Sequence, residues 1–255
     1  MKHVVMFSTG LSSAVCLSKV QEKHGRDNTI ALLTDTQWED EDNYRFSNEV
    51  IGYLNANLVV IKEGRTPKDV WLETRYLVGP TGAPCTRILK IEQTMKWLKQ
   101  QEDEITLYFG IGADEEHRTH GLVKRYTAVG AKVEFPLVDE PMEHLQMKDI
   151  VENEWGIKIP RMYYMGFSHA NCGGRCVKAG QEHFIRLMKQ WPERFNEIAD
   201  IEQRFRDITN SDTTILRAKR NGEEVKITLR ELQKEQDTGQ LSLCWDSEIP
   251  CECFF

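Results

Sequence analysis

Residues 4–15 of the chain read VVMFSTGLSSAV, and this stretch decides how the first part of the protein folds. Its apolar run, Val4–Phe7, has the length of a buried strand, and helical spacing of apolar residues follows over Leu11–Val20. The small residues Ser8, Thr9 and Gly10 between them predict a tight strand-to-helix turn. Free amides at a helix start attract phosphate, and glycine allows the backbone to approach it. The turn is therefore a candidate nucleotide site.

Serine hydroxyls extend this candidate site. Ser8, Ser12 and Ser13 can each add a donor to a bound phosphate. A plain Ser-rich helix cap is the alternative interpretation. The turn is neither a Walker loop, because no Gly-Lys-Ser/Thr follows, nor a dinucleotide fingerprint, because the G-x-G-x-x-G spacing is absent.

Strand and helix patterns alternate through the first two thirds of the chain. This alternation predicts an α/β fold: a doubly wound, mostly parallel five-stranded sheet with helices on both faces. Ligands in such folds bind beyond the carboxyl ends of the strands. After the first strand and helix, we expect strands over 29–34, 58–61, 105–111 and 132–136, and helices over 40–54, from 66 onward and over 85–100.

Helical patterns dominate after residue 145. We expect helices over 146–155, 177–190, 192–207 and 229–235, with a small hairpin turning at Asn221-Gly222. The chain is therefore divided into a nucleotide-binding α/β domain, residues 1–145, and a helical, cysteine-bearing C-terminal extension, residues 146–255.

The composition restricts the class of protein. The chain has 255 residues, of which 40% are hydrophobic, enough to bury a full core. The net charge of -7 argues against broad electrostatic capture of nucleic acid. No apolar run is long enough to span a membrane, and the first strand begins too close to Met1 for a signal peptide. We expect a cytoplasmic protein whose seven cysteines bind metal or react rather than form disulfides.

Two other strand ends carry chemically useful side chains. Asp35 follows the second strand and can bind ribose hydroxyls or a metal ion, or simply cap a helix. The segment leaving the fourth strand runs from Gly110 to Arg118, whose guanidinium can pair with a phosphate or lie on the surface. The acidic run Glu39–Asp42 is interpreted as a solvated helix start that favours the helix dipole.

Cysteines occur in three separate segments besides the first helix. Cys172 and Cys176 flank a Gly-Gly turn, Cys85 stands at a loop-helix junction, and the tail contributes Cys251–Cys253. Four thiolates suit either zinc or an iron-sulfur cluster. Two small buried thiols are the alternative for the Gly-Gly pair, and Cys16 is interpreted as core packing.

Taken in order over residues 3–180, these motifs resemble the phosphoadenosine phosphosulfate reductase family of the PP-loop ATP pyrophosphatases, which have the adenine nucleotide alpha-hydrolase-like fold. The Gly173-Gly174 turn and the following residues Val177–Gly180 are similar to a subgroup common in phage and mobile-element genomes. Thr9 stands where the family loop has a glycine, and Ser12 where it has an aspartate that helps hold magnesium. The matching segments are Ser8–Ser13, Thr34–Trp38, Gly110–Arg118, Phe135–Leu137 with Asp149–Ile150, and Tyr164–Phe167 before Cys172.

The resemblance implies an enzyme that binds ATP and Mg²⁺ and transfers sulfur to an acceptor, with a [4Fe-4S] cluster nearby, or zinc in its place. Adenylyl-sulfate (PAPS or APS) reduction by a tail thiol is the alternative activity, and a nucleotide- and metal-binding regulatory subunit is the non-enzymatic one. Implied partners are a sulfur donor protein or thiol reductant, a nucleic acid as one class of acceptor, and a second copy of the chain in a homodimer. The implied site residues are Ser8, Thr9, Gly10, Ser12, Ser13, Asp35, Gly110 and Arg118 for the nucleotide, Asp35, Arg118 and Cys253 for catalysis, and Cys85, Cys172, Cys176 and Cys251 for the metal.

Overall fold

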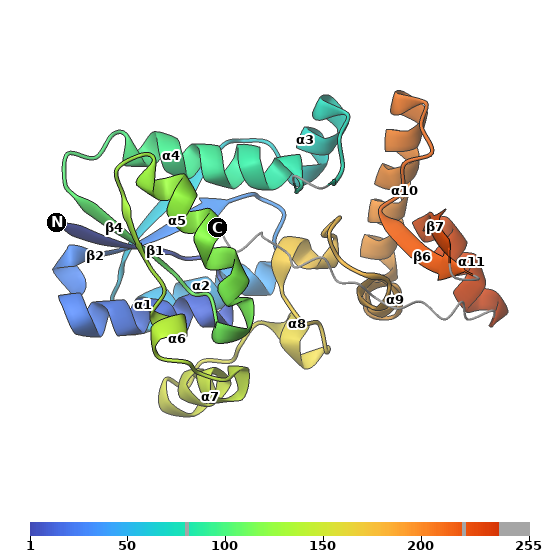
Figure 1. Ribbon diagram of the computed structural model, residues 1–255. Helices are drawn as coiled ribbons and strands as arrows, with labels where there is room; N and C mark the ends of the chain where they lie inside the picture. Colours follow the sequence, from blue (N-terminus) through green and yellow to red (C-terminus); the bar gives the residue numbers. More distant parts are fainter. Residues whose placement is uncertain (80–81, 221–222, 240–255) are drawn as a thin grey trace.

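A five-stranded parallel sheet forms the core of the first part of the chain in the computed structural model, which describes residues 1–79, 82–220 and 223–239 (Figure 1). Its strand order is β3-β2-β1-β4-β5, so the chain builds one half outward from β1 and then crosses back. The carboxyl ends of β1 and β4 flank this switch point, where open α/β sheets bind ligands. The strands are β1 (Lys2–Met6), β2 (Thr29–Asp35), β3 (Asn57–Lys62), β4 (Ile105–Phe109) and β5 (Lys132–Glu134).

Helices cover both faces of this sheet, as the alternating pattern predicts. Val5 and Phe7 pack against α1 (Leu11–His24) and α2 (Glu41–Tyr53) in one apolar cluster. Val4 and Met6 point the other way, into a cluster with α4 (Glu92–Leu98) and α5 (Thr119–Thr127). Because successive strand residues alternate between faces, the apolar part of β1, Val4–Met6, is buried on both sides of the sheet. The doubly wound α/β fold is therefore confirmed.

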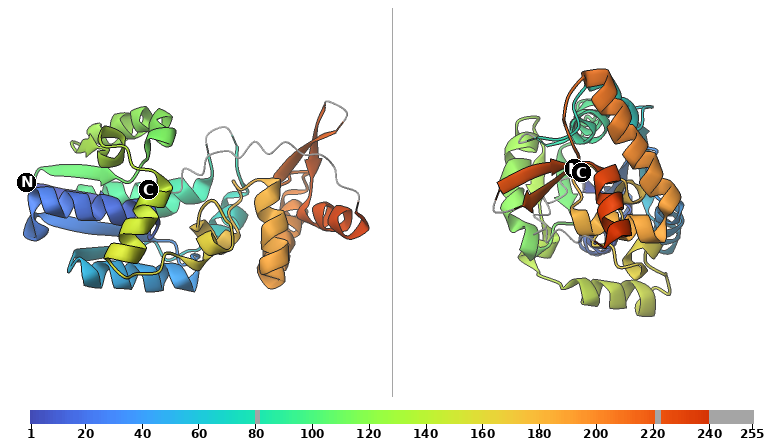
Figure 2. Two further views of the ribbon diagram at one scale, coloured as in Figure 1. Left: turned by 90° about the horizontal axis from the view of Figure 1, so that it is seen from below. Right: turned by 90° about the vertical axis from the view of Figure 1, so that its right-hand side faces the viewer.

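A third apolar cluster joins the C-terminal elements to α3 (Pro67–Thr74). It contains α9 (Gln181–Gln190), α10 (Pro192–Thr209), the antiparallel hairpin β6 (Leu216–Arg220) and β7 (Glu223–Ile227), and α11 (Leu229–Thr238). These elements lie beyond the carboxyl ends of the sheet and give the molecule an elongated outline (Figure 2). The hairpin strands confirm that prediction, while its turn at Asn221-Gly222 lies outside the described residues.

Short elements connect these three clusters. After β5 the chain returns beneath α1, where Met147 and Val151 join the α1 cluster. The division of the chain at residue 145 stays a prediction. The connecting elements are the 3-10 helices η1 (Arg26–Asn28), η3 (Ala113–Arg118) and η5 (Asn171–Gly174), the π-helices η2 (Thr86–Ile91) and η4 (Ile150–Glu154), and the helices α6 (Pro136–Asp139), α7 (His144–Asp149) and α8 (Arg161–Tyr164).

Two helices differ from the sequence prediction in their first turns. The helix predicted from Val177 begins at Gln181, because Cys176–Ala179 forms a separate turn closed by the Ala179 N–H on the Cys176 carbonyl. The helix predicted from Cys85 starts as the π-helical turn η2, a form often found at functional sites. No helix in the described part of the chain is long and apolar enough to cross a membrane.

Candidate functional site

The β1 turn, Ser8–Ser13, joins β1 to α1 at the switch point of the sheet. Gly10 is the N-cap residue of α1, with extended backbone, and no side chain caps this helix start. The Ser13 hydroxyl donates to the Gly10 carbonyl at 2.8 Å, and the Ser8 hydroxyl lies 3.4 Å from the Ser13 hydroxyl. The first amides of α1 therefore remain available to an anion.

Thr9 holds the most strained position of the β1 turn. Its φ is 63°, in the left-handed region that β-branched residues rarely occupy. The residue is only 1% exposed, and its hydroxyl has no hydrogen-bond partner among the described residues. The family loop similar to this turn has glycine here, which adopts this conformation freely. Strain combined with an unpaired buried hydroxyl is typical of a binding site.

Gly110 supports the β1 turn from the end of β4. A Cβ atom at this position would lie 2.7 Å from the Ser12 carbonyl oxygen and 2.8 Å from the Ser13 nitrogen. Only glycine therefore allows the chain leaving β4 to pack directly on the start of α1. The sequence predicted close approach of Gly110 to a ligand, and its observed neighbour is the backbone of the candidate phosphate site.

A small pocket with a volume of about 10 Å³, room for about one water molecule, lies between the carboxyl ends of β1 and β2, next to the β1 turn. Ser8, Thr9 and Asp35, three of the residues that the sequence predicted, lie in its wall. Two charged residues that the sequence analysis did not select, Glu39 and Lys90, line it as well. The remaining lining residues are Met6, Phe7, Leu32, Leu33, Thr34 and Tyr44.

Asp35 is fully engaged by groups of the protein itself. It accepts hydrogen bonds from the Tyr44 hydroxyl at 2.6 Å and the Gln37 amide at 2.8 Å, and the Lys62 ammonium lies 2.9 Å away. Burial raises its pKa, but these three donors outweigh that effect and the pKa is lowered. The Gln37 bond also holds Gln37 at φ 57°, where the similar family motif has glycine. Asp35 thus organises the loop after β2, and its predicted contact with ribose or Mg²⁺ stays a prediction.

Lys90 and Glu39 bring opposite charges to the pocket wall. Lys90 is buried, the Glu39 side chain is 9% exposed, and the Lys90 Nζ lies 3.9 Å from Glu39 Oε1. Lys90 belongs to the π-helical turn that follows Cys85, and the irregular turn directs it inward. Conservation of the spacing between Cys85 and Lys90 among related sequences is the signal that could have identified Lys90.

Arg118 forms an ion pair with Glu115 on the same short helix, η3, and its side chain is buried. It is not among the residues that line the pocket. The structure therefore brings Ser8–Ser13, Gly110 and Asp35 to one edge of the sheet, while the predicted phosphate contact of Arg118 stays a prediction.

Cys85, Cys172 and Cys176 lie in the same apolar cluster, beside the C-terminal helices. Cys16 belongs to the separate α1 cluster, where burial raises the pKa of its thiol to about 12, in line with core packing. Within residues 1–79, 82–220 and 223–239, no three His, Cys, Asp or Glu side chains are arranged to hold a metal ion. The described residues alone thus do not fit a metal centre, and Cys251 and Cys253 lie outside them.

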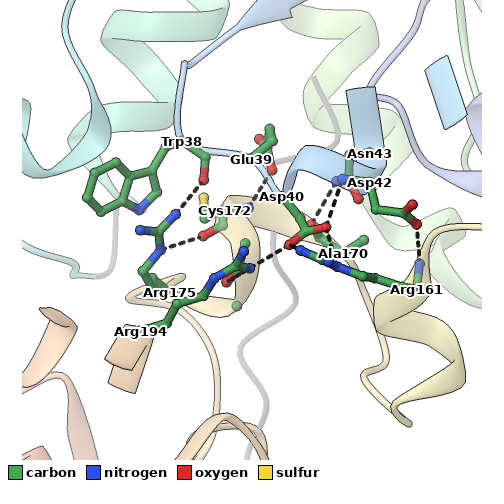
Figure 3. A network of polar contacts seen from close by, with 12 residues as sticks. Trp38, Glu39, Asp40, Asp42, Asn43, Arg161, Ala170, Cys172, Arg175 and Arg194 are labelled. Carbon is green, nitrogen blue, oxygen red and sulfur yellow. Dashed lines mark hydrogen bonds and ion pairs between the residues drawn. The ribbon is translucent and has the colours of Figure 1, made fainter. Parts of the chain in front are cut away.

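The cysteine turn, Asn171–Arg175, is held from several sides (Figure 3). Cys172 and the two following glycines all have positive φ, with Cys172 at 56°. Glu39 Oε2 accepts the Cys172 N–H at 2.5 Å. The Cys172 carbonyl accepts from Arg175, the Gly173 carbonyl from Arg194 and the Gly174 carbonyl from His183 Nε2. The turn is therefore fixed by bonds from β2's loop and from the C-terminal helices.

Asp40, next to Glu39, is buried at the start of α2. This corrects the sequence interpretation of Glu39–Asp42 as a solvated helix start. Its side chain is 0% exposed and accepts from Arg161 at 2.8 and 2.9 Å and from Arg194 at 2.6 Å. It also caps α2 by accepting the Asp42 N–H. These donors outweigh burial, which raises its pKa, so the pKa is lowered. Asp40 is buried because arginines from distant segments cover it, and Glu39 is covered by Lys90 and the Cys172 backbone.

Comparison with known proteins finds relatives by sequence over part or most of the chain. The chain is 36% identical over 75 residues, 29% of either chain, to a phosphoadenosine 5'-phosphosulfate reductase of Cronobacter sakazakii. It is 24% identical over 241 residues to an uncharacterized protein of Methanocaldococcus jannaschii. That alignment covers 89% of this chain but 53% of the relative, so the chain spans about half the length of that protein. No family model matches.

Among solved structures, an NH3-dependent NAD synthetase of Campylobacter jejuni has a TM-score of 0.38 and 12% identity, over 82% of this chain and 85% of that one. The local match to the reductase supports the wider PP-loop superfamily for this chain. It agrees with the resemblance found in the motifs themselves.

Proposed function

We propose that the protein is a PP-loop enzyme that binds ATP at the β1 turn and activates an acceptor for sulfur transfer. One observation carries the nucleotide site. Thr9 is held in a left-handed conformation with an unpaired buried hydroxyl, in the wall of a pocket at the carboxyl ends of β1 and β2. A phosphate oxygen supplies the acceptor that this hydroxyl lacks among the described residues.

Several groups around the β1 turn can contribute to binding the nucleotide phosphates. The first amides of α1 and the hydroxyls of Ser8 and Ser12 face the phosphates, with the helix dipole behind them. Lys90 contributes a positive charge from the pocket wall. Mg²⁺ arrives bound to the nucleotide phosphates and needs few protein ligands. This suits a site in which Ser12 replaces the loop aspartate and Asp35 is already engaged by three donors.

The proposed reaction has two steps. An oxygen of the acceptor attacks the α-phosphorus of ATP, and the bond to the β-phosphate breaks to release pyrophosphate. Hydrosulfide supplied by a sulfur donor then attacks the adenylated carbon of the acceptor and displaces AMP, which takes the acceptor oxygen with it. The α1 amides and Lys90 stabilise the negative charge that develops on pyrophosphate, which is where preorganised donors accelerate a reaction most. A nucleic acid is the class of acceptor proposed here.

The iron-sulfur part of the hypothesis is kept apart from these steps. Cys85, Cys172 and Cys176 share one cluster without forming a metal site among the described residues. No step of the reaction is therefore assigned to a cluster. Iron and zinc analysis of anaerobically purified protein tests the prediction, and protein without iron contradicts it.

Adenylyl-sulfate reduction is the second candidate, favoured by the 36% identity to the Cronobacter sakazakii reductase. In this reaction a thiolate attacks the sulfur of the bound adenylyl sulfate and displaces the nucleotide, and a second thiol releases sulfite as a disulfide forms. Pyrophosphate release from ATP selects the first proposal, and sulfite release from PAPS or APS selects the second. If the protein releases neither product, the nucleotide-binding regulatory subunit is the remaining candidate.

The nucleotide site is tested by Thr9→Val, which keeps the shape of the side chain and removes its hydroxyl. We expect ATP affinity to fall about tenfold, because a hydrogen bond to a charged group is lost. We expect the free energy of unfolding of the unliganded protein to rise by about 1 kcal/mol, because a buried hydroxyl without a partner is removed. Calorimetric titration and urea unfolding measure the two effects.

Thr9→Ser is the matched control, since it keeps a hydroxyl at the same position. It should bind ATP within about threefold of the wild type, while Thr9→Val does not. Equal ATP affinity in all three proteins would contradict the assignment of the β1 turn as the phosphate site.

A further inference from the structure

Glu39 lies between the nucleotide pocket and the cysteine turn and contacts both. One carboxylate oxygen, Oε1, lies 3.3 Å from the Thr36 hydroxyl and 3.9 Å from the Lys90 ammonium, on the pocket side. The other, Oε2, accepts the Cys172 N–H at 2.5 Å (Figure 3). The side chain is buried and belongs to the pocket wall. A single charged group thus connects two sites that are far apart in the sequence.

The Cys172 backbone needs such a contact. A residue other than glycine in the left-handed region costs on the order of 1 kcal/mol or more and persists only when its surroundings hold it there. The Gly173 and Gly174 positions carry no comparable cost, because glycine has no Cβ atom. A short hydrogen bond to a carboxylate is about twice as strong as one between neutral groups. Glu39 is therefore the contact best able to keep Cys172 in this conformation.

The charge balance on the pocket side changes when an anion binds. The Lys90 ammonium lies 3.9 Å from Glu39 Oε1, and Lys90 lines the same pocket. A phosphate group bound at the β1 turn, beside this pocket, attracts the Lys90 ammonium and repels the Glu39 carboxylate. Both effects move negative charge toward the Cys172 amide and strengthen that hydrogen bond. Binding in the pocket and order in the cysteine turn are then linked, and such linkage acts equally in both directions.

We infer that Glu39 is a positioning residue that couples occupancy of the nucleotide pocket to the conformation of Cys172. The inference rests on the proposed function insofar as the natural occupant is ATP. It goes beyond it by assigning the cysteine turn a response to nucleotide binding. Cys172 is then presented in one backbone conformation when the phosphates are bound, and is less firmly held when the pocket is empty.

The test compares the wild type with Glu39→Gln, which keeps the size of the side chain and an acceptor oxygen but removes the charge. Selective ¹⁵N-cysteine labelling allows the hydrogen exchange of the Cys172 amide to be followed without and with ATP or inorganic pyrophosphate. In the wild type, either ligand should slow this exchange about tenfold, in keeping with a strengthened bond to a charged group. In Glu39→Gln, exchange should be about tenfold faster without ligand and unchanged when ligand binds.

Pyrophosphate affinity provides a readout that a purely structural role would not produce. Glu39→Gln should bind pyrophosphate several-fold more tightly, because the Glu39 carboxylate no longer repels the bound phosphates. Glu41→Gln is the control, since this neighbouring glutamate is exposed at the start of α2 and should behave as the wild type.

The outcomes separate the two hypotheses. Binding of pyrophosphate with the expected exchange effects, but no binding of ATP, would support the coupling and contradict the proposed function. Binding of either ligand without any change at Cys172, or identical behaviour of Glu39→Gln and Glu41→Gln, would overturn the coupling alone. A wild type that binds neither ligand overturns both.

Discussion

The β1 turn and the cysteine turn each contain a strained residue, but they differ in whether the polar groups around it have partners within the protein. Each holds a residue other than glycine in the left-handed region, Thr9 at φ 63° and Cys172 at φ 56°. The Thr9 hydroxyl is buried and lacks a partner in the described part of the chain. In the cysteine turn, by contrast, Glu39 binds the Cys172 amide, and Arg175, Arg194 and His183 bind three successive carbonyls.

The difference indicates which turn is prepared for a ligand. Buried polar groups in folded proteins are nearly always paired, so an unpaired one at a strained position suggests a partner that arrives from outside. The Cys172 amide and the three carbonyls of the cysteine turn already have partners within the protein. These contacts connect the loop after β2 to the C-terminal helices. Changes to the cysteine turn should therefore affect stability first, and changes to the β1 turn should affect binding.

The largest expected effect is that of Asp40→Ala on the cysteine-turn side. The substitution leaves Arg194 and the partly exposed Arg161 without their shared carboxylate and removes the cap of α2. We expect the free energy of unfolding to fall by about 3 kcal/mol, as when one partner of a buried ion pair is removed. Urea unfolding measures it. Glu41→Ala, at an exposed neighbour, is the control and should change stability by less than about 0.5 kcal/mol. A similar loss of stability in both variants would contradict the structural role assigned to Asp40.

Gly110→Ala tests the support of the β1 turn. The added Cβ would collide with the backbone of Ser12 and Ser13, so the start of α1 must move. We expect a loss of about 2 kcal/mol in stability, typical of overpacking, together with a loss of ATP binding. Gly121→Ala is the matched control: its Cβ meets nothing within 4 Å in α5, and it should stabilise the protein by about 0.5 kcal/mol. Normal ATP binding by a folded Gly110→Ala protein would separate Gly110 from the site.

His183 should give the cysteine turn a dependence on pH. Burial, and the nearby His169, lower its pKa from 6.5 to about 3, so it donates to the Gly174 carbonyl as a neutral ring. Between these two values the unfolded chain binds a proton that the folded chain does not, so stability falls as the pH falls. From pH 7 to pH 5 this residue should account for a loss of about 2 kcal/mol.

His183→Gln should remove that share of the pH dependence while keeping a donor for Gly174. Urea unfolding at pH 7 and pH 5 of both proteins measures it. An equal loss in the wild type and in His183→Gln would show that other groups cause the effect.

Much of the fold could be predicted from the sequence because its signals are local. The apolar run Val4–Phe7, the small-residue turn after it and the spacing over Leu11–Val20 specify a strand, a turn and a helix within a few residues of one another. Repetition of this unit is enough to predict a doubly wound parallel sheet and to place Ser8–Ser13 and Asp35 at its ligand edge.

Tertiary structure alone decided which side chains complete the site. The sequence pattern predicts a solvated helix start at Glu39 and Asp40. Both side chains are instead covered by partners that come from far along the chain. Cys172 is 133 residues from Glu39, while Arg161 and Arg194 are 121 and 154 residues from Asp40. Local patterns follow the period of a strand or helix and contain no information about such pairings. The sequence therefore determined where the β1 turn lies, and long-range packing determined the charges around it and the left-handed strain at Thr9 and Cys172.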